Sequence, residues 1–240
     1  MSMAPLDGGE ARRYARQLVL RGFGGAGQQA LKAGSVLVVG AGGLGSPAIA
    51  YLAAAGIGRL GIVDDDQVAL SNLQRQIIHD EAGIGTDKVA SAARFAAALN
   101  AGVRIETHRV RLSPATAQPL IKDYDLVLDG TDNLGTRRAV AQAARAAGKM
   151  LVSGAVSMFD GQLTVFSPDG PDFTALYPEA LEDADMPDCE VTGIMGPVTG
   201  VIGALMAMEA IKILSGGGEP LVGRLLLYDG RRAKFTELGY

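Results

Sequence analysis

A glycine-rich turn between a strand-like segment and a helix-like segment is the feature that most limits the folds open to this sequence. Residues 40–45 read Gly-Ala-Gly-Gly-Leu-Gly and match the pattern G-x-G-x-x-G. A β-branched run precedes this turn, and an alanine-rich segment follows it. Gly40 permits the tight turn, Gly42 lets phosphate oxygens approach the backbone, and Gly45 allows the helix to pack closely on the strand. The context therefore predicts a phosphate-binding turn.

Strand-like and helix-like segments alternate around this turn. Strands are expected at 35–39, 59–63, 103–110, 125–128 and 149–153, and helices at 46–55, about 86–99, from 113 onward and at 133–147. This order is typical of repeated βαβ units, which form a parallel sheet with covered faces. Two later hairpins, turned by Asp160-Gly161 and Asp229-Gly230, predict an antiparallel extension. The expected fold is a Rossmann-like parallel α/β sheet with helices on both faces, extended by antiparallel strands.

The chain of 240 residues is expected to form one large domain with an appendage. Residues 1–34 combine arginines with apolar residues at helical spacing, which predicts an N-terminal helical arm. Residues 35–240 are assigned to a single α/β domain. Within it, the stretch 169–190 is rich in acids and contains no lysine or arginine. We expect a long acidic loop there, either a solvated connector or a functional lid.

Composition narrows the classes of partner and compartment. The formal net charge of −4 provides no basic field for a phosphate backbone, so no nucleic-acid partner is expected. The single cysteine, Cys189, excludes an intrachain disulfide and a four-cysteine zinc site, and no signal peptide is recognisable, which predicts a cytoplasmic protein. The uncharged stretch 191–208 approaches the length of a membrane span. Because it contains several glycines and a proline, we interpret it as a buried or interface helix and expect no membrane.

Polar residues follow the second predicted strand. Asp64 ends that strand, where an acid accepts hydrogen bonds from ribose hydroxyls. Asn72, Arg75 and Gln76 lie just beyond, on a segment expected to border the carboxyl edge of the sheet, although a surface salt bridge would also explain the arginine. Lys88 lies in the first turn of a predicted helix, where the helix dipole disfavours a cation unless an anion is close. A bound polyphosphate would supply that anion.

Asp132 follows a later strand and is the candidate Mg²⁺ ligand, since Mg²⁺ typically takes one or two carboxylates plus phosphates. Capping the helix that begins near 133 is the alternative role. Asp65 and Asp66 are interpreted as solvated. The glycine turn and its neighbours therefore predict a triphosphate site. The turn and ribose acid alone would also fit an NAD-dependent oxidoreductase, but His79 and His108 lie in no recognisable catalytic context and are interpreted as core or surface residues.

Five runs of residues resemble the ThiF/MoeB/HesA family. They are Arg-Tyr-Ala-Arg-Gln at 13–17, Gly-Ala-Gly-Gly-Leu-Gly at 40–45, Asp-Asp-Asp-Gln-Val-Ala-Leu-Ser-Asn-Leu-Gln-Arg-Gln at 64–76, Thr-Asp-Asn at 131–133 and Met-Glu-Ala-Ile-Lys at 208–212. The similarity covers nearly the whole chain. It implies an ATP- and Mg²⁺-dependent adenylyltransferase that activates the C-terminal Gly-Gly carboxylate of a ubiquitin-like sulfur-carrier protein, for thiamine or molybdopterin biosynthesis. The products implied are an acyl-adenylate and pyrophosphate.

The resemblance also implies roles for individual residues. Asp64 would hold the ribose and Asp132 the metal, while Arg16 would reach the site of the neighbouring subunit in a homodimer. The nucleotide-binding residues so predicted are Gly40, Gly42, Gly43, Gly45, Asp64, Asn72, Arg75, Gln76 and Lys88, and the predicted catalytic residues are Arg16, Arg75, Lys88 and Asp132.

The chain departs from the family pattern at the zinc-binding cysteines. Many members carry two Cys-x-x-Cys pairs for zinc, whereas 172–176 here reads Asp-Phe-Thr-Ala-Leu, so no zinc is expected. The carrier, its pathway and the role of Cys189 stay open; adenylation itself needs no thiol. The loop at 169–190 is expected to be mobile until a carrier tail binds. The alternatives are the NAD-dependent oxidoreductase and a non-catalytic binder of a ubiquitin-like protein.

Overall fold

A mixed sheet of eight strands, in the order β3-β2-β1-β4-β5-β6-β7-β8, forms the centre of the computed structural model. The structure describes residues 5–178, 180 and 192–240. Strands β1 to β5 are parallel, and β6, β7 and β8 continue the sheet antiparallel. The predicted fold class is confirmed. The strands are β1 Ser35–Val39, β2 Arg59–Val63, β3 Arg104–His108, β4 Leu126–Asp129, β5 Met150–Ser157, β6 Asp160–Phe166, β7 Arg224–Asp229 and β8 Lys234–Gly239.

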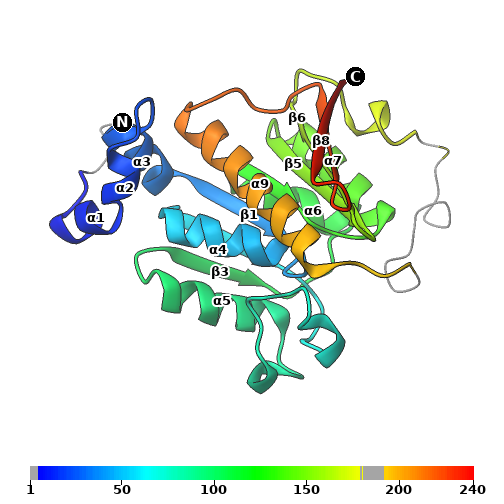
Figure 1. Cartoon of the computed structure of the whole chain (residues 1–240), viewed down its shortest axis with the longest axis horizontal. Coiled ribbons are helices and arrows are strands. Elements are labelled where there is room, and N and C mark those ends of the chain that lie inside the picture. Colours follow the sequence, from blue (N-terminus) through cyan, green and yellow to red (C-terminus); the bar gives the residue numbers. More distant parts are fainter. Residues whose placement is uncertain (1–4, 179, 181–191) are drawn as a thin grey trace.

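Helices cover both faces of the parallel half, as Figure 1 shows. Along β1, Val36 and Val38 belong to the apolar core shared with α4, α5 and α9, whereas Leu37 and Val39 belong to the core shared with α6 and α7. A parallel strand buried on both faces needs apolar side chains at successive positions, and β1 provides them. The helices are α1 Gly8–Arg13, α2 Ala15–Leu18, α3 Gly24–Ala33, α4 Gly45–Ala55, α5 Lys88–Leu99, α6 Pro114–Ile121, α7 Leu134–Ala146 and α9 Gly196–Ser215, with short 3-10 helices η1 Leu70–Asn72, η2 Glu81–Gly83 and η3 Phe173–Ala175.

The N-terminal arm is helical but consists of three short helices. Asp7 caps α1, accepting hydrogen bonds from the backbone N–H groups of Gly9 and Glu10. Gly22 and Gly24 adopt positive φ and separate α2 from α3, because a continuous helix requires negative φ at every residue. Helix α3 then packs against α9. The division of the chain at residue 34 stays a prediction.

Helix α9 is long and apolar enough, by length and composition, to cross a membrane. It packs against α4 and against β5 and β6. The helices α4 and α9 approach closely at Gly203, where a Cβ atom would collide with the Leu44 carbonyl oxygen. These contacts are those of a core helix. It begins at Gly196, within the uncharged stretch 191–208 that the sequence indicates to be a helix, and ends beyond it at Ser215.

The first hairpin turns at a different place from the one predicted. Ser157 pairs with Asp160, so the turn is Met158-Phe159, and Asp160-Gly161 already belongs to β6. Gly161 has a packing role, because a Cβ there would collide with the Ile202 side chain of α9. In the second hairpin the Asp-Gly pair does begin the connection between β7 and β8.

The acidic stretch 169–190 is not a structureless loop in its first part. Phe173 and Tyr177 are buried and stack with ring centroids 4.5 Å apart, on either side of the end of η3. These two rings belong to the apolar core that also contains residues of α7. The acidic composition of the stretch gave no sign of this packing. The remainder of the stretch, including Cys189, lies almost entirely outside the described residues, so the expectations about its mobility and about the thiol stay predictions.

Candidate nucleotide-binding site

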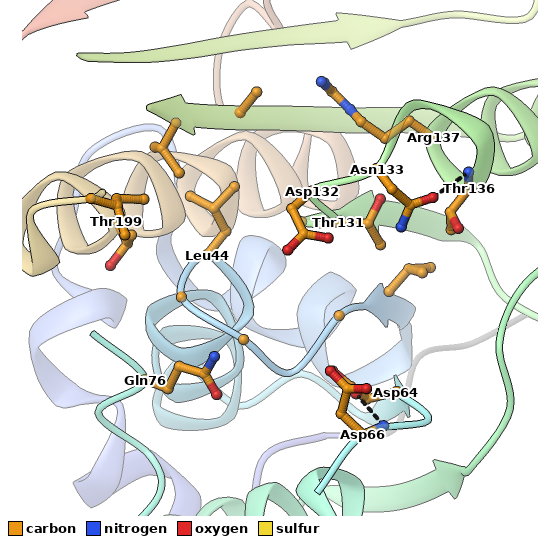
Figure 2. A pocket seen from close by; sticks show the side chains of 18 of the residues that line it. Leu44, Asp64, Asp66, Gln76, Thr131, Asp132, Asn133, Thr136, Arg137 and Thr199 are labelled. Carbon is orange, nitrogen blue, oxygen red and sulfur yellow. Dashed lines mark hydrogen bonds between the residues drawn. The ribbon is translucent and has the colours of Figure 1, made fainter. Parts of the chain in front are cut away.

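A cavity of about 450 Å³ opens at the carboxyl ends of the parallel strands. Strand β1 lies between β2 and β4, so the connections on its two sides run in opposite directions along the sheet. Open α/β sheets bind ligands at such a switch point. Figure 2 shows the cavity between the glycine turn, the loop after β2 and the start of α7.

The glycine turn follows β1 and begins α4. Gly40 has φ of 92°, which favours glycine, and a Cβ there would lie 3.2 Å from the Gly130 carbonyl oxygen. A Cβ at Gly45 would collide with the Gly40 carbonyl oxygen, so this glycine closes the turn without lining the cavity. Gly42 and Gly43 do line it. The turn therefore brings bare backbone and the N-terminus of α4 to the cavity, where an anion is favoured.

Asp64 directly follows β2 and is held by two backbone groups. The Ala41 N–H donates to its Oδ2 at 2.8 Å and the Asp66 N–H to its Oδ1 at 2.9 Å. Burial raises the pKa of Asp64 above its ordinary value, and the neighbouring Lys88 opposes that rise. Each carboxylate oxygen keeps acceptor capacity, so Asp64 can still accept from ribose hydroxyls.

His79 is a core histidine with a structural task at the site. Its Nε2 lies 2.9 Å from the Ala41 carbonyl oxygen and its Nδ1 lies 3.0 Å from Ser91 Oγ. Because a carbonyl only accepts, Nε2 carries the proton and Nδ1 accepts from the serine hydroxyl. Burial lowers the pKa of His79, which favours this neutral form. His79 thereby fixes the glycine turn from behind.

Among the described residues, four cationic side chains line the cavity: the predicted Lys88 and Arg75, and also Arg111 and Arg137. Lys88 is buried at the start of α5, and its Nζ lies 2.9 Å from Asp66 Oδ2. The anion expected beside this lysine is thus already present in the protein, and Asp66 is not merely solvated. The other supposedly solvated acid, Asp65, lies 3.1 Å from Arg111 Nε at the cavity rim.

Arg75 is the second predicted cation. Its Nη1 donates to the Ser71 carbonyl oxygen at 3.1 Å, and no carboxylate of a described residue forms an ion pair with it. The surface salt bridge considered for Arg75 is therefore wrong for the described part of the chain. The adjacent Gln76 lines the cavity with 3% of its surface exposed, and its Oε1 has no hydrogen-bond partner among the described residues. A buried polar atom without a partner is costly and suits a site that receives a ligand.

Asp132 faces the glycine turn across the cavity in Figure 2. The alternative assigned to it, capping α7, is wrong, because Asn133 occupies the N-cap and accepts the Thr136 N–H at 2.8 Å. Asp132 is exposed and has no hydrogen bond or ion pair with any residue that the structure describes. Its carboxylate is free to bind a cation, which fits an ion held by one protein carboxylate and phosphate oxygens.

Besides Gly45, two further predicted site residues, Asn72 and Arg16, lie away from the cavity lining. Asn72 accepts the Ala69 N–H at 3.3 Å and helps to shape the loop after β2. Arg16 is exposed on α2 in the N-terminal arm. The structure brings together Gly40, Gly42, Gly43, Asp64, Arg75, Gln76, Lys88 and Asp132.

The sequence analysis missed a buried ion pair in the cavity wall, of which the arginine lines the cavity and the aspartate lies behind it. Asp129 ends β4 with no exposed surface, and its Oδ2 lies 3.5 Å from Arg137 Nε in α7. Thr131 donates its N–H and its hydroxyl to Asp129 Oδ1 at 3.0 and 2.7 Å, and Arg137 Nη2 donates to Ser153 Oγ at 3.1 Å. The Arg137 guanidinium also lies over the Tyr177 ring, 4.8 Å from its centroid. The signal available was the Asp-x-x-Asp spacing after β4, of which only the second acid was considered.

The cavity also extends beyond the residues expected for a nucleotide. Its far wall comes from the β5–β6 hairpin and the approach to α9, where the parallel and antiparallel halves of the sheet meet. Thr199 of α9, also unpredicted, lies against Gly43 and donates to the Gly196 carbonyl oxygen at 2.6 Å. This wall is lined by Ala155, Val156, Ser157, Asp160, Gly161, Gln162, Ile194 and Leu227.

Comparison with known proteins identifies the family. The family model described as ThiF matches residues 14–239. The chain belongs to the ThiF family. "Probable adenylyltransferase/sulfurtransferase MoeZ" of Mycobacterium tuberculosis is 47% identical over 234 residues, which cover 95% of this chain and 60% of MoeZ. The "SAMP-activating enzyme E1" of Haloferax volcanii is 43% identical over 235 residues, 98% of this chain and 87% of that protein.

Among solved structures, that of PaaA superposes with a TM-score of 0.83 at 23% identity, covering all of this chain and 76% of PaaA. At that identity the likeness concerns the fold. The chain spans 60% of the length of MoeZ.

Proposed function

We propose that this protein is an ATP-dependent adenylyltransferase that activates the C-terminal Gly-Gly carboxylate of a ubiquitin-like sulfur-carrier protein in thiamine or molybdopterin biosynthesis. One observation carries the proposal: a single cavity in a ThiF-family chain joins the glycine turn, the held acid Asp64, the cations Lys88 and Arg75, and the Asp132 carboxylate. The names of MoeZ and of the SAMP-activating enzyme E1, an adenylyltransferase and an activating enzyme, support the same reaction class. We place the protein in the cytoplasm, acting on a protein partner rather than on nucleic acid or a membrane.

The parts of the cavity match the parts of a nucleoside triphosphate. The glycine turn and the α4 N-terminus would receive phosphate oxygens, and Asp64 would accept from the ribose. Lys88 and Arg75 would neutralise the polyphosphate. Gln76 would complete its hydrogen bonds on the same ligand.

The reaction requires positioning and charge stabilisation more than a protein nucleophile. A carboxylate oxygen of the carrier attacks the α-phosphorus, the P–O bond to the β-phosphate breaks, and pyrophosphate leaves with the displaced electron pair. Lys88 and Arg75 would stabilise the charge that moves onto pyrophosphate. Asp132 would hold Mg²⁺, which when bound supplies Lewis-acid polarisation of phosphate oxygens. The wall formed by the β5–β6 hairpin would receive the carrier tail.

We further propose a homodimer in which Arg16 acts on the partner's site, because the N-terminal arm does not bring this residue to the cavity of its own chain. Mixing inactive Arg16→Ala with inactive Asp132→Ala should restore partial activity, since one heterodimer site keeps both residues. No recovery after demonstrated subunit exchange would contradict action in trans.

The second candidate, an NAD-dependent oxidoreductase, shares the glycine turn and ribose acid. Against it, none of the described residues that line the cavity is a histidine, whereas the cations Lys88 and Arg75 and the Asp132 carboxylate are present. Binding of Mg·ATP supports adenylation, binding of NAD supports the alternative, and binding of neither supports a non-catalytic partner of a ubiquitin-like protein.

The deciding experiment is exchange of labelled pyrophosphate into ATP with candidate carriers that end in Gly-Gly. We expect exchange only when the carrier is present, because formation of the acyl-adenylate must be reversed for label to enter ATP. The matched control is the same carrier without its terminal glycine. Absence of exchange with every sulfur carrier of the organism would overturn the proposal.

A further inference from the structure

Asp66 makes two contacts with Lys88. The Lys88 backbone N–H donates to the Asp66 carbonyl oxygen at 3.0 Å, and Lys88 Nζ donates to Asp66 Oδ2 at 2.9 Å. One residue therefore fixes both the first residue of α5 and the far end of its side chain. The burial of the two partners differs: the lysine side chain is 8% exposed and the aspartate side chain 58%.

The position of Lys88 makes such a partner necessary. A buried ammonium at the N-terminus of a helix lies at the positive end of the helix dipole, so it is unfavourable without a nearby anion. The Asp66 carboxylate provides that anion, and it is itself held in place. The backbone N–H of Asp66 donates to Asp64 Oδ1 at 2.9 Å, and Asp64 Oδ2 accepts the Ala41 N–H at 2.8 Å. A chain of hydrogen bonds thus links the glycine turn, the ribose acid and the cavity lysine, and Figure 2 shows Asp66 beside Asp64.

We propose that Asp66 is a positioning residue that holds the Lys88 ammonium where the polyphosphate binds. An ammonium has three N–H donors. Asp66 takes one of them, and no other described residue is recorded as accepting from Nζ, which leaves two donors for phosphate oxygens. Asp66 acts through Lys88 and needs no contact with the ligand. The inference rests on the proposed function in one respect, that the anion is the polyphosphate of ATP.

A double-mutant cycle on ligand affinity tests this role directly. The dissociation constants of Mg·ATP and of adenosine are measured by calorimetry on the whole chain. In the otherwise unchanged protein, Asp66→Asn should weaken Mg·ATP binding at least about fivefold, because the ammonium loses its charged anchor. In the Lys88→Ala background the same substitution should cause no weakening, because only a carboxylate that repels the triphosphate is then removed. Adenosine affinity should stay unchanged throughout.

Two results would overturn the proposal. Equal weakening of Mg·ATP in both backgrounds would mean that Asp66 acts independently of Lys88. A parallel loss of adenosine affinity would mean that Asp66 merely shapes the ribose site. Asp80→Asn is the matched control, since Asp80 is an exposed acid whose ion pair with the exposed Arg94 spans 3.4 Å. It removes the same charge and should change Mg·ATP affinity less than twofold.

Pyrophosphate exchange adds a catalytic readout. Asp66→Asn should lower the kcat of carrier-dependent exchange at least about tenfold, because a displaced ammonium no longer meets the charge that forms on pyrophosphate. An unchanged kcat would also overturn the positioning role. If the wild-type protein binds Mg·ATP but no carrier supports exchange, the proposed function fails while the affinity cycle still decides the role of Asp66. If it binds no Mg·ATP, both fail.

Discussion

Two acid–arginine sets around the cavity contain the same residue types in opposite environments. Asp129 has no exposed surface and pairs with Arg137, which is buried in the cavity wall, and we call them the floor pair. Asp132 and Arg75 lie at the edge of the cavity, without carboxylate–cation partners among the described residues, and we call them the rim residues. Asp129 and Asp132 are only three positions apart in the chain. Burial therefore decides which charges are structural and which are available to a ligand.

The physical reason is the cost of removing charge from water. Burial raises the pKa of Asp129, and the Arg137 charge and the Thr131 hydrogen bonds oppose that rise. Such a pair adds little net stability, but loss of one partner leaves an isolated buried charge. The rim residues, an exposed Asp132 and a half-buried Arg75, carry a smaller penalty, so their charges can be matched by a transient ligand.

The largest effect on stability is expected from a substitution that breaks the floor pair. Arg137→Ala should lower the free energy of unfolding by about 3–5 kcal/mol, because Asp129 is left buried without its cation. Urea unfolding followed by circular dichroism measures the change. The double variant Asp129→Leu with Arg137→Met is the control and should recover much of that loss. A loss below about 1 kcal/mol in Arg137→Ala would show that the floor pair is not structural.

The second prediction concerns the rim residues. Asp132→Ala and Arg75→Ala should each reduce carrier-dependent pyrophosphate exchange about a hundredfold or more, the loss typical of a group that contacts developing charge. Their unfolding free energies should stay within about 0.5 kcal/mol of wild type, because neither side chain is buried and neither forms an ion pair with a described residue.

Asp123→Ala is the matched control for Asp132→Ala. Asp123 is an exposed acid that precedes β4, at the end of the strand opposite the cavity. This variant should retain full exchange. Exchange within about threefold of wild type in folded Asp132→Ala would instead remove the rim residues from the site.

The smallest expected effect is a pH dependence of the free energy of unfolding, caused by His79, which contacts the glycine turn. Burial lowers the pKa of His79 below its ordinary 6.5, so the unfolded chain takes up the proton first on acidification. The contribution of neutral His79 to stability is therefore complete above pH 6.5, and it is lost as the pH falls from 6.5 toward the pKa of His79 in the folded state. A loss on the order of 1 kcal/mol is expected, the scale of one hydrogen bond.

Urea unfolding between pH 7.5 and 5 on wild type and His79→Gln measures this contribution, and the difference isolates His79 from His108, whose pKa is also lowered by burial. The variant should show a flatter profile. Parallel profiles of unfolding free energy against pH in wild type and variant would contradict the role of neutral His79 in holding the glycine turn.

Much of the site could be read from the sequence because strand ends and phosphate turns are local patterns. The β-branched run before Gly40 fixed the first strand, and Asp64, Lys88 and Asp132 each follow or begin a regular element whose period is visible in the sequence. Parallel strands bring their carboxyl ends to one edge, which places these side chains around one cavity. The action of Arg16 on the partner subunit's site and the activation of a ubiquitin-like carrier stay predictions.

The sequence by itself determined the parallel sheet and the glycine turn, since periodicity and turn residues encode backbone hydrogen bonding and buried faces over short distances. Tertiary structure alone decided which of two acids in one motif is buried, that Asp66 holds a lysine 22 positions away, and that Gly161 serves packing against α9 rather than a turn. These outcomes depend on how distant loops and helices approach one another. No local pattern specifies that approach, because it is set by the packing of the whole core.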